Sequence, residues 1–421
     1  MTAFRPADIL LPANTDMEKW AVVACDQYTS EPGYWAELEQ LIGAAPSALN
    51  LILPEVYLGS GNEQARIDTI HKNMEKYIAD GIFTEYKDAL IYIERVQDDG
   101  KVRAGLVGCI DLEEYDYSKG SSSPVRATEA TVVERIPPRL KVRRGADIEL
   151  THIMILIDDG SGSVIEPLYA KKQGFEKLYD TPLLKKGGSI TGWLLDEQSK
   201  ADVLAALDKL GEKEGFEKRY GLTDTPVLLY AMGDGNHSLA TAKAYYEELK
   251  AANPGKDMSN HPARYALCEI VNLHSPALEF EAIHRIVTGA DENQLFADIT
   301  NALGLTEGKT DGAQCFGIVN SGQTVWYTAA NTSSKLTVGT LQNFLDTWCK
   351  ENGAGIDYIH GTEVVEKLSM DNGSVGFILP DMGKNELFPT VIADGALPRK
   401  TFSMGHAWDK RYYIEARRIT D

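Results

Sequence analysis

The sequence predicts an α+β protein, and three stretches lead to that prediction. The first is a wholly apolar run at 227–232, which is followed by Gly233, Asp234 and Gly235 and then by apolar residues at helical spacing up to residue 250. This pattern is typical of a buried strand that turns into a helix. The second consists of runs 90–96 and 103–112 around an Asp-Asp-Gly turn, which predict a β-hairpin. The third is the alternation of helix-like and strand-like segments after residue 291, which predicts an α/β or α+β lobe.

The turn between the strand at 227–232 and the following helix suits an anion. Its glycines tolerate positive φ and allow a ligand to approach the backbone. Unpaired N–H groups at the start of a helix favour a phosphate, and the side chain of Asp234, Asn236 or Ser238 would cap the first turn. A carboxylate beside a phosphate must bind Mg²⁺ or accept a proton. The alternative is an ordinary turn in which the glycines serve packing and Asp234 is only a cap.

Length and composition limit the class of protein. A chain of 421 residues is too long for one core, and we expect a region at 1–290 and a C-terminal lobe at 291–421 that contribute to one cleft. No apolar run approaches the ~20 residues that cross a bilayer, and no signal peptide is expected at the N-terminus. Five widely spaced cysteines predict reduced thiols in a cytoplasmic protein. Cys25 differs from the others because it precedes Asp26 in a polar loop.

The formal net charge of −20 argues against nucleic acid as a partner. Such binding draws its affinity from phosphate neutralisation by Lys and Arg, and the basic cluster at 135–144 has no aromatic residues interleaved with it. We therefore expect a small-molecule substrate and neither nucleic acid nor a membrane as partner. The sequence leaves the oligomeric state open, with a homodimer as one alternative.

Periodicity and turn residues predict the remaining elements in chain order. We expect strands at 20–24, 153–157, 183–195, 264–272 and 278–287 and helices at 32–42, 66–80 and 199–210. In the C-terminal lobe we expect helices at 292–303, 338–350, 362–370 and 385–393, and strands at 315–319, 324–329, 356–360 and 374–379. The acidic run at 111–116 predicts a solvated face, and the segment 118–124 predicts a flexible connector.

Several segments resemble a known family. The run GDGNHSLATA is similar to the DGHHR-x-x-A signature of the family labelled domain of unknown function 1015, which is related to the ParB/sulfiredoxin-like superfamily with its ATP- or ADP-dependent free-serine kinases. Further similar segments are ACDQYTSEPGYW, GLVGCIDLEEYDYSKG, VRATEAT, AIHRIV and LPRKTF. The resemblance implies a mixed-sheet ParB/sulfiredoxin-like core with an additional α/β C-terminal lobe. Two positions depart from the pattern, since Asn236 replaces the usual His and Ser238 the usual Arg.

The resemblance also implies site residues. It implies Asp234 as the Mg²⁺ ligand or the group that orients the hydroxyl, His237 as a polarising group, and an early acid as general base. Asp26 is the closest match for that acid. Glu31 is the alternative, because the serine kinases of the superfamily use an early Glu as general base; against it, Glu31 also reads as an acid that starts a helix. Ligands of the nucleotide phosphates are implied at positions of the matching segments: Gly233, Gly235, Asn236, Ser238, Arg126, Glu129, His284, Arg285, Lys400 and Thr401. A period-2 strand turns His284 and Arg285 to opposite faces, so only one of them can meet a ligand.

The function that follows is a small-molecule phosphotransferase that uses ATP or ADP and Mg²⁺, with an alcohol as acceptor. L-Serine is the acceptor that the analogy suggests. Two alternatives use the same anion site. One is a non-catalytic regulator that binds a nucleotide or phosphometabolite, and the other is a hydrolase of phosphate esters with water as acceptor.

Overall fold

The computed structural model describes residues 2–29, 31–131, 133–150 and 152–420. The chain divides into two compact units. The first unit comprises Met1–Ala127, Thr131–Leu278 and His406–Asp421, and the second comprises Thr128–Ala130 and Glu279–Gly405. The expected boundary at residue 290 thus differs from the structural one. Residues 406–421, expected in the C-terminal lobe, belong to the first unit because their strands complete its sheets.

A large mixed sheet forms the centre of the first unit, in agreement with an α+β protein. Its strand order is β11-β12-β5-β6-β14-β10-β13-β8-β7, and β1 also pairs with β6. Strand β10 runs parallel to β14 and antiparallel to β13, which in turn runs parallel to β8. The strands are β1 (Phe4–Arg5), β5 (Ile91–Val96), β6 (Val102–Asp111), β7 (Tyr115–Asp116), β8 (Val125–Arg126), β10 (Met154–Ile157), β11 (Glu176–Pro182), β12 (Ser189–Leu194), β13 (Tyr230–Asp234) and β14 (Tyr265–Asn272).

Two smaller sheets join the ends of the sequence. One has the order β4-β2-β23-β9 and the other pairs β22 with β3. Their strands are β2 (Ala7–Pro12), β3 (Val22–Val23), β4 (Phe83–Ala89), β9 (Ile148–Leu150), β22 (Tyr412–Tyr413) and β23 (Ala416–Arg418). A buried charge network holds this C-terminal segment, since Glu269 accepts from Arg411 at 2.9 Å and from Arg103 at 3.3 Å. Arg411 also donates to Glu415 at 2.6 Å.

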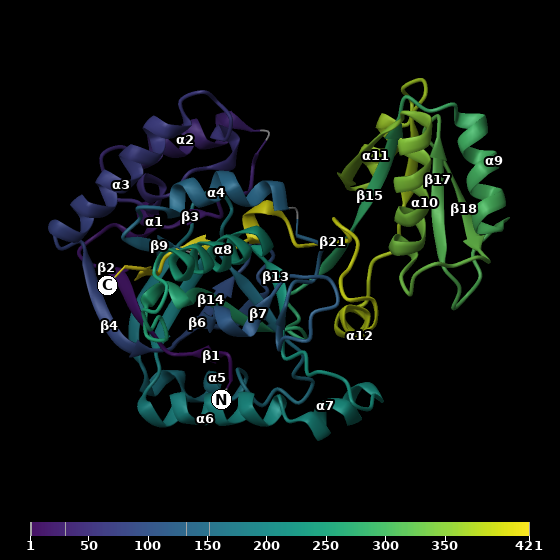
Figure 1. Cartoon of the computed structure of the whole chain (residues 1–421). Helices are drawn as coiled ribbons and strands as arrows, with labels where there is room; N and C mark the ends of the chain where they lie inside the picture. Colours follow the sequence, from purple (N-terminus) through teal and green to yellow (C-terminus); the bar gives the residue numbers. More distant parts are fainter. Residues whose placement is uncertain (1, 30, 132, 151, 421) are drawn as a thin grey trace. The chain divides into compact units, whose positions relative to one another are not determined.

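Helices cover the sheets of the first unit (Figure 1). They are α1 (Met17–Trp20), α2 (Pro32–Ile42), α3 (Glu63–Ala79), α4 (Ile136–Arg143), α5 (Pro167–Lys171), α6 (Glu197–Leu210), α7 (Lys213–Tyr220) and α8 (Asn236–Ala252). Helix α8 lies beside α4 (Figure 1). It buries Leu239, Ala242 and Tyr246, which recur at helical spacing.

The second unit is a sheet with helices on both faces. Its strand order is β16-β18-β17-β20-β15-β19, with β21 also on β15. The strands are β15 (Phe280–Thr288), β16 (Leu305–Glu307), β17 (Cys315–Asn320), β18 (Gln323–Ala329), β19 (Gly355–His360), β20 (Val375–Ile378) and β21 (Phe402–Met404). The helices are α9 (Glu292–Leu303), α10 (Thr337–Asn352), α11 (Thr362–Leu368) and α12 (Lys384–Asp394). Val365 of α11 packs on Val319 and Ile378 of one face, while Gln342 of α10 meets Arg285 on the other.

Three local predictions differ from the structure in their bounds or in the type of element, and hydrogen bonds explain the difference. Residues 17–20, partly expected as a strand, form α1 because the Asp16 carboxylate accepts from the N–H groups of Glu18 and Lys19. The strand expected from residue 227 begins at Tyr230, because the N–H groups of Leu229 and Tyr230 both donate to the Pro124 carbonyl. The strand expected at 183–195, with an interruption at Gly187 and Gly188, forms only after that interruption, as β12, which is the second half of a hairpin with β11.

Two expectations from composition, on membrane-spanning segments and on cysteines, can be compared with the described part of the chain. Within it, no helix combines the length and the apolarity that spanning a membrane requires. All five cysteines are free thiols.

Candidate functional site

The turn before α8 packs tightly against the segment that precedes β10. Strand β13 ends at Asp234, and Gly235 takes a left-handed φ of 79° as the N-cap of α8. A Cβ at Gly235 would lie 3.1 Å from the Cα of Ile153 and 3.5 Å from Cδ2 of His152. Glycine therefore meets two demands here, a positive φ and a close approach of backbone to backbone. Gly235 has no side chain, so no side-chain oxygen of the N-cap residue caps the first turn of α8, and the residues expected to cap it, Asp234, Asn236 or Ser238, are not the N-cap residue.

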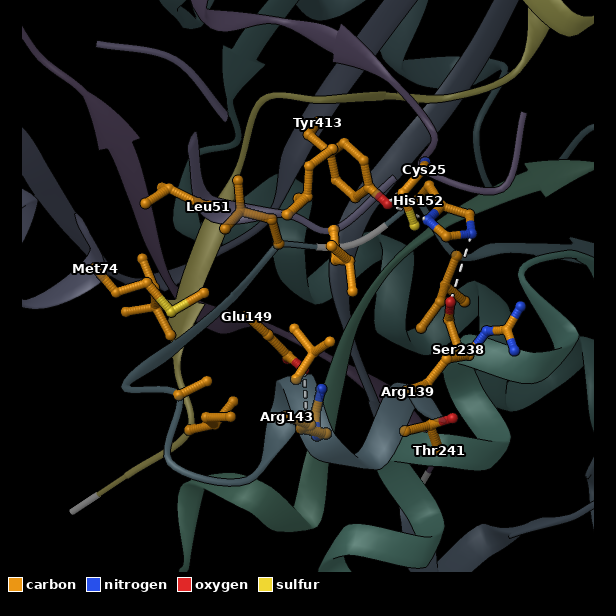
Figure 2. A pocket seen from close by; sticks show the side chains of 18 of the residues that line it. Cys25, Leu51, Met74, Arg139, Arg143, Glu149, His152, Ser238, Thr241 and Tyr413 are labelled. Carbon is orange, nitrogen blue, oxygen red and sulfur yellow. Dashed lines mark hydrogen bonds and ion pairs between the residues drawn. The ribbon is translucent and has the colours of Figure 1, made fainter. Parts of the chain in front are cut away.

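His152 is the buried centre of the site, with only 3% of its surface exposed. Its Nδ1 lies 2.7 Å from the hydroxyl of Tyr413, which also accepts from the backbone N–H of Cys25 at 3.2 Å. Its Nε2 lies 3.5 Å from Oγ of Ser238 and 3.7 Å from Oδ2 of Asp26 (Figure 2 shows the ring between Tyr413 and Ser238). The imidazole thus links the loop after β3, the first turn of α8 and strand β22.

Electrostatics make Asp26 and His152 an ion pair. Burial raises the pKa of Asp26, but the positive charge of His152 and hydrogen bonds from His152 and Gln27 outweigh it and hold the pKa below its ordinary value. Burial lowers the pKa of His152, but the carboxylates of Asp26, Asp234 and Glu55 outweigh it and raise the pKa above its ordinary value. The carboxylate is therefore ionised and the imidazole favours its protonated form.

Asp234 completes the polar part of the site. Its Oδ1 accepts from the N–H of Gly235 at 2.8 Å, and its Oδ2 lies 3.5 Å from Nζ of Lys410. Nearby, Oδ1 of Asn236 is buried and has no hydrogen-bond partner among the described residues. Carboxylate and amide oxygens are the donors that Mg²⁺ prefers, and Mg²⁺ commonly takes only one or two carboxylates from a protein. The residues Asp234 and Asn236 therefore fit such an ion.

A second ion pair and a half-buried thiol flank this centre. Arg139 of α4 donates to the carboxylate of Glu55, and both side chains are largely buried. Burial raises the pKa of Glu55, and Asp26 adds to that effect against the attraction of Arg139. Burial also raises the pKa of the Cys25 thiol, which leaves Cys25 a protonated, unreactive group at neutral pH.

The comparisons with known proteins agree with the resemblance seen in the sequence. The family model described as protein of unknown function (DUF1015) matches residues 5–348. The chain belongs to the DUF1015 family. Among curated proteins, no significant match to this chain was found.

Solved structures similar to this DUF1015 protein have low sequence identity. A free serine kinase in complex with AMP is 13% identical, with a TM-score of 0.38, and the match covers 75% of this chain and 92% of that one. A conserved hypothetical protein from Pyrococcus furiosus is 12% identical, with a TM-score of 0.37 and coverage of 75% and 95%. SbnI with a C-terminal truncation from Staphylococcus aureus is 8% identical, with a TM-score of 0.38 and coverage of 71% and 82%. Likeness at this level assigns no function to the DUF1015 chain, and its site must be judged by its own geometry.

The structure brings together part of the predicted set of site residues. Asp26, Asp234, Gly235 and Ser238 all lie around His152. Gly233, half-buried in β13, and Asn236 are their chain neighbours in the same turn. His237 lies in the first turn of α8, where its carbonyl accepts from the Thr241 hydroxyl at 2.7 Å. Glu31, the alternative acid, is exposed at the start of α2.

Arg126, by contrast, is used within the fold of this DUF1015 protein. It is 5% exposed, and its guanidinium donates to the carbonyls of Ser123 at 2.6 Å, Pro226 at 3.0 Å and Val227 at 3.2 Å. Burial lowers its pKa. These bonds anchor the segment that leads into β13.

The other predicted ligands gather in the second unit. Arg285 is fully buried and donates to Oε1 of Gln342 at 2.9 Å and to the carbonyls of Lys400 at 2.9 Å and Arg399 at 3.2 Å. Lys400 itself has a positive φ of 56°. The N–H of Thr401 donates to Oε1 of Glu129 at 3.4 Å. Burial raises the pKa of Glu129, against the opposing charge of Lys400.

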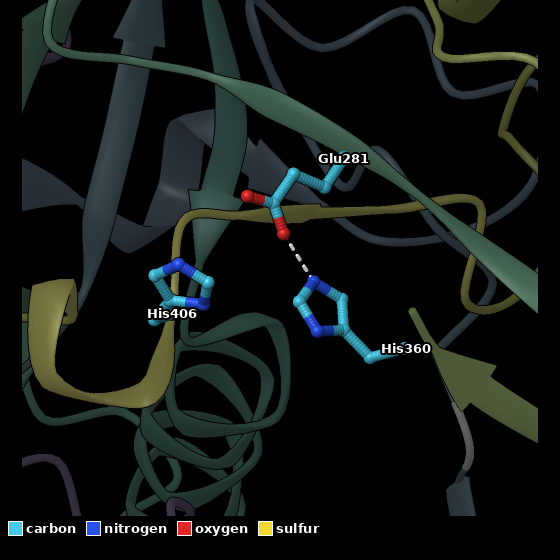
Figure 3. A group of neighbouring side chains, drawn as sticks. All are labelled: Glu281, His360 and His406. Carbon is cyan, nitrogen blue, oxygen red and sulfur yellow. Dashed lines mark hydrogen bonds and ion pairs between the residues drawn. The ribbon is translucent and has the colours of Figure 1, made fainter. Parts of the chain in front are cut away.

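Two histidines of the second unit are also engaged. Nδ1 of His284 accepts from the N–H of Leu379 at 3.2 Å, and burial lowers the pKa of this imidazole. Nε2 of His360 contacts the carboxylate of Glu281 directly (Figure 3). His406, the third side chain drawn, belongs to the first unit.

Sequence reasoning missed His152, Lys410 and Tyr413 as members of the site. His152 stands two residues before a buried strand, and this position was the only signal for it. Lys410 and Tyr413 lie more than 170 residues after the turn in sequence, and only the pairing of β22 with β3 brings them to it.

Proposed function

We propose that this DUF1015 protein is a nucleotide- and Mg²⁺-dependent phosphotransferase that acts on the alcohol group of a small molecule. The observation that carries the proposal is the pair of carboxylates, Asp26 and Asp234, around the buried His152 at the start of α8. A helix start favours phosphate, and a carboxylate beside it can receive the proton of an attacking hydroxyl.

Each residue has a part that follows from its surroundings. The first turn of α8 would bind the phosphate that is transferred. Asp26, kept ionised by His152, would accept the hydrogen bond and then the proton of the acceptor hydroxyl. Phosphoryl transfer depends mainly on positioning and on stabilising charge, so a carboxylate with a low pKa suffices for this role. His152 in its protonated form would balance negative charge on the phosphoryl oxygens.

Asp234 and Asn236 would hold Mg²⁺. The ion, when bound, would neutralise charge on the phosphate oxygens of the nucleotide. Lys410, 3.5 Å from Asp234, holds that carboxylate in place between turnovers. The finer assignments rest on the motif resemblance alone: a ParB/sulfiredoxin-like core around β10, β13 and α8, ATP or ADP as donor, and L-serine as acceptor.

A second candidate function is a regulator that binds a nucleotide or phosphometabolite without turnover. The observation that favours it is Ser238, which stands where the family motif has Arg. The hydroxyl of Ser238 faces Nε2 of His152 at 3.5 Å. A hydroxyl supplies none of the bidentate charge that a guanidinium gives a phosphate.

The test measures release of ADP or AMP from Mg·ATP and Mg·ADP, with and without L-serine and a panel of other hydroxy compounds. Asp234→Asn should reduce acceptor-dependent release by about 100-fold or more, since it removes a charge from the reacting centre. Asp202→Asn is the matched control, because Asp202 is an exposed carboxylate that pairs with Lys171 on the surface. It should leave the rate unchanged.

The outcomes separate the candidates. Acceptor-dependent release that Asp234→Asn abolishes supports the kinase. Release without an acceptor identifies a hydrolase, and nucleotide binding without release identifies the regulator. If the purified chain neither binds a nucleotide nor releases ADP or AMP, that result contradicts an anion site at the start of α8.

A further inference from the structure

A cavity of about 140 Å³ lies next to the anion site, within the first unit. In Figure 2, His152 and Ser238 lie at its right-hand end, and Leu51 and Met74 lie at its left. His152, Ser238 and Cys25 line the cavity and also belong to the site or contact it. The cavity is thus continuous with the place where the phosphate is proposed to bind.

The walls of the cavity are aliphatic. Most of its lining consists of Leu, Ile, Val, Met and Ala side chains, including Leu51, Leu53, Met74, Val142, Ile148 and Ile153. The cavity is partly open, so its aliphatic walls face solvent until an apolar group covers them, and covering them is favourable. A dry aliphatic cavity of about 150 Å³ holds a benzene-sized molecule. The volume and the lining both indicate an apolar occupant.

Most polar groups in the lining already have partners, but Nε of Arg143 is buried without a hydrogen-bond partner among the described residues. Both carboxylate oxygens of Glu149 accept hydrogen bonds, one from Arg417 at 3.0 Å and one from Arg143 at 2.6 Å. Glu55 is paired with Arg139. Nε of Arg143 would match only part of the polar edge of an adenine, so a nucleotide base would lose more hydrogen bonds to water than it gains here.

We propose that this cavity holds the hydrocarbon part of the phosphate acceptor, and that the acceptor is therefore an alcohol with an apolar chain or ring of about six carbon atoms. The inference rests on the proposed phosphate site, because the phosphate at α8 places the chain at the mouth of the cavity. L-Serine has too little apolar surface to use it.

Binding of n-alkyl monophosphates, from ethyl to octyl, tests the inference by calorimetry on the full chain, with inorganic phosphate and Mg·ADP alongside. Burial of a methylene contributes about 0.8 kcal/mol, so affinity should rise about fourfold per added methylene. The rise should stop once the cavity is full, at about six carbons.

Two variants change the cavity in opposite directions. Ala146→Leu adds bulk to the lining and should abolish most of the rise with chain length. Met74→Ala lengthens the cavity at the end opposite His152 and should move the optimum to longer chains. Ala206→Leu on α6 is the control, since Ala206 is half-buried and lies outside the cavity lining. Mere damage to the fold would not move the optimum to longer chains.

The outcomes keep the two proposals apart. Phosphate and Mg·ADP binding without dependence on chain length would overturn the inference and leave the proposed function standing. Chain-length dependence that Ala146→Leu removes, in a protein without phosphotransfer, would support the cavity and contradict the kinase. Loss of Mg·ADP binding in Ala146→Leu, with no effect of alkyl length, would place the nucleotide base in the cavity and overturn the inference.

Discussion

The charged side chains at the start of α8 and those around Arg285 differ in their hydrogen-bond and ion-pair partners. In the first unit, Asp26, Asp234 and His152 face one another as side chains, and Oδ1 of Asn236 is buried without a described partner. In the second unit, the guanidinium of Arg285 is taken up by Gln342 and by backbone carbonyls. Both regions carry family-like sequence segments. A matching segment alone therefore does not mark a ligand site, and unsatisfied hydrogen-bonding groups decide which of the two regions can receive a ligand.

The largest effect should come from Arg285→Met. It removes the donor that bonds Oε1 of Gln342 and the carbonyls of Ile283, Arg399 and Lys400, which should cost about 3–5 kcal/mol of unfolding free energy in the second unit. Hydrogen exchange resolved by peptide would report the loss for 279–405 separately from the first unit. Arg399→Met, at a half-exposed residue 3.5 Å from Asp346, should cost less than about 1 kcal/mol. If Arg285→Met leaves hydrogen exchange in 279–405 unchanged but abolishes nucleotide binding, Arg285 binds the ligand, and the contrast between the two regions is wrong.

A smaller effect is expected from Gly235→Ala. The left-handed φ and the Cβ contact with Ile153 should together cost about 1–3 kcal/mol and weaken phosphate binding. Gly221→Ala is the matched control, because Gly221 has a φ of +66° and no atoms within 4 Å of a Cβ. It should cost about 1 kcal/mol and leave binding unchanged. Urea denaturation measures the stability of both variants, and phosphate titration measures their binding. Equal effects of Gly235→Ala and Gly221→Ala would show that the close approach to Ile153 has no special role.

The smallest effect concerns protonation in the first unit. Asp26→Asn removes the nearest negative charge from His152, so the pKa of His152 should fall. The ¹H resonances of the imidazole report this pKa by NMR titration. Glu31→Gln, at the exposed start of α2, should leave it unchanged. A shift with Glu31→Gln and none with Asp26→Asn would reverse the choice between the two acids.

The ion pair of Asp26 and His152 also makes the free energy of unfolding depend on pH. His152 has a raised pKa, so its contribution is complete below its ordinary value of 6.5 and is lost as pH rises through the raised value. Asp26 has a lowered pKa, so its contribution is complete above 3.8 and is lost as pH falls through the lowered value. The wild-type advantage over Asp26→Asn should therefore be largest between these two ordinary values.

Local patterns predicted most elements of this fold. The helices Pro32–Ile42 and Glu292–Leu303 have the predicted bounds, because periodicity and their first residues are local signals. The hairpin of β5 with β6 formed around its Asp-Asp-Gly turn. Residues 17–20 were missed because a short capped helix outweighed the apolar run that follows Trp20.

The site was harder to predict because its members come from distant segments. Asp234 and Gly235 carry a local signal, a glycine turn between a strand and a helix. For His152 the only local signal is its position two residues before a buried strand, since its role depends on Asp26, which lies 126 residues earlier in the sequence. The cavity is still less visible, because aliphatic residues that leave a void have the same pattern as those that fill a core.

The return of residues 406–421 to the first unit has a consequence for synthesis on the ribosome. Strand β23 lies between β2 and β9, and β22 pairs with β3 near the start of the chain. The two smaller sheets of the first unit therefore lack β22 and β23 while 279–405 are translated. That inserted segment has all of its own strands by residue 405, so it can fold first, and the site formed by Asp26, Asp234 and Tyr413 is assembled last.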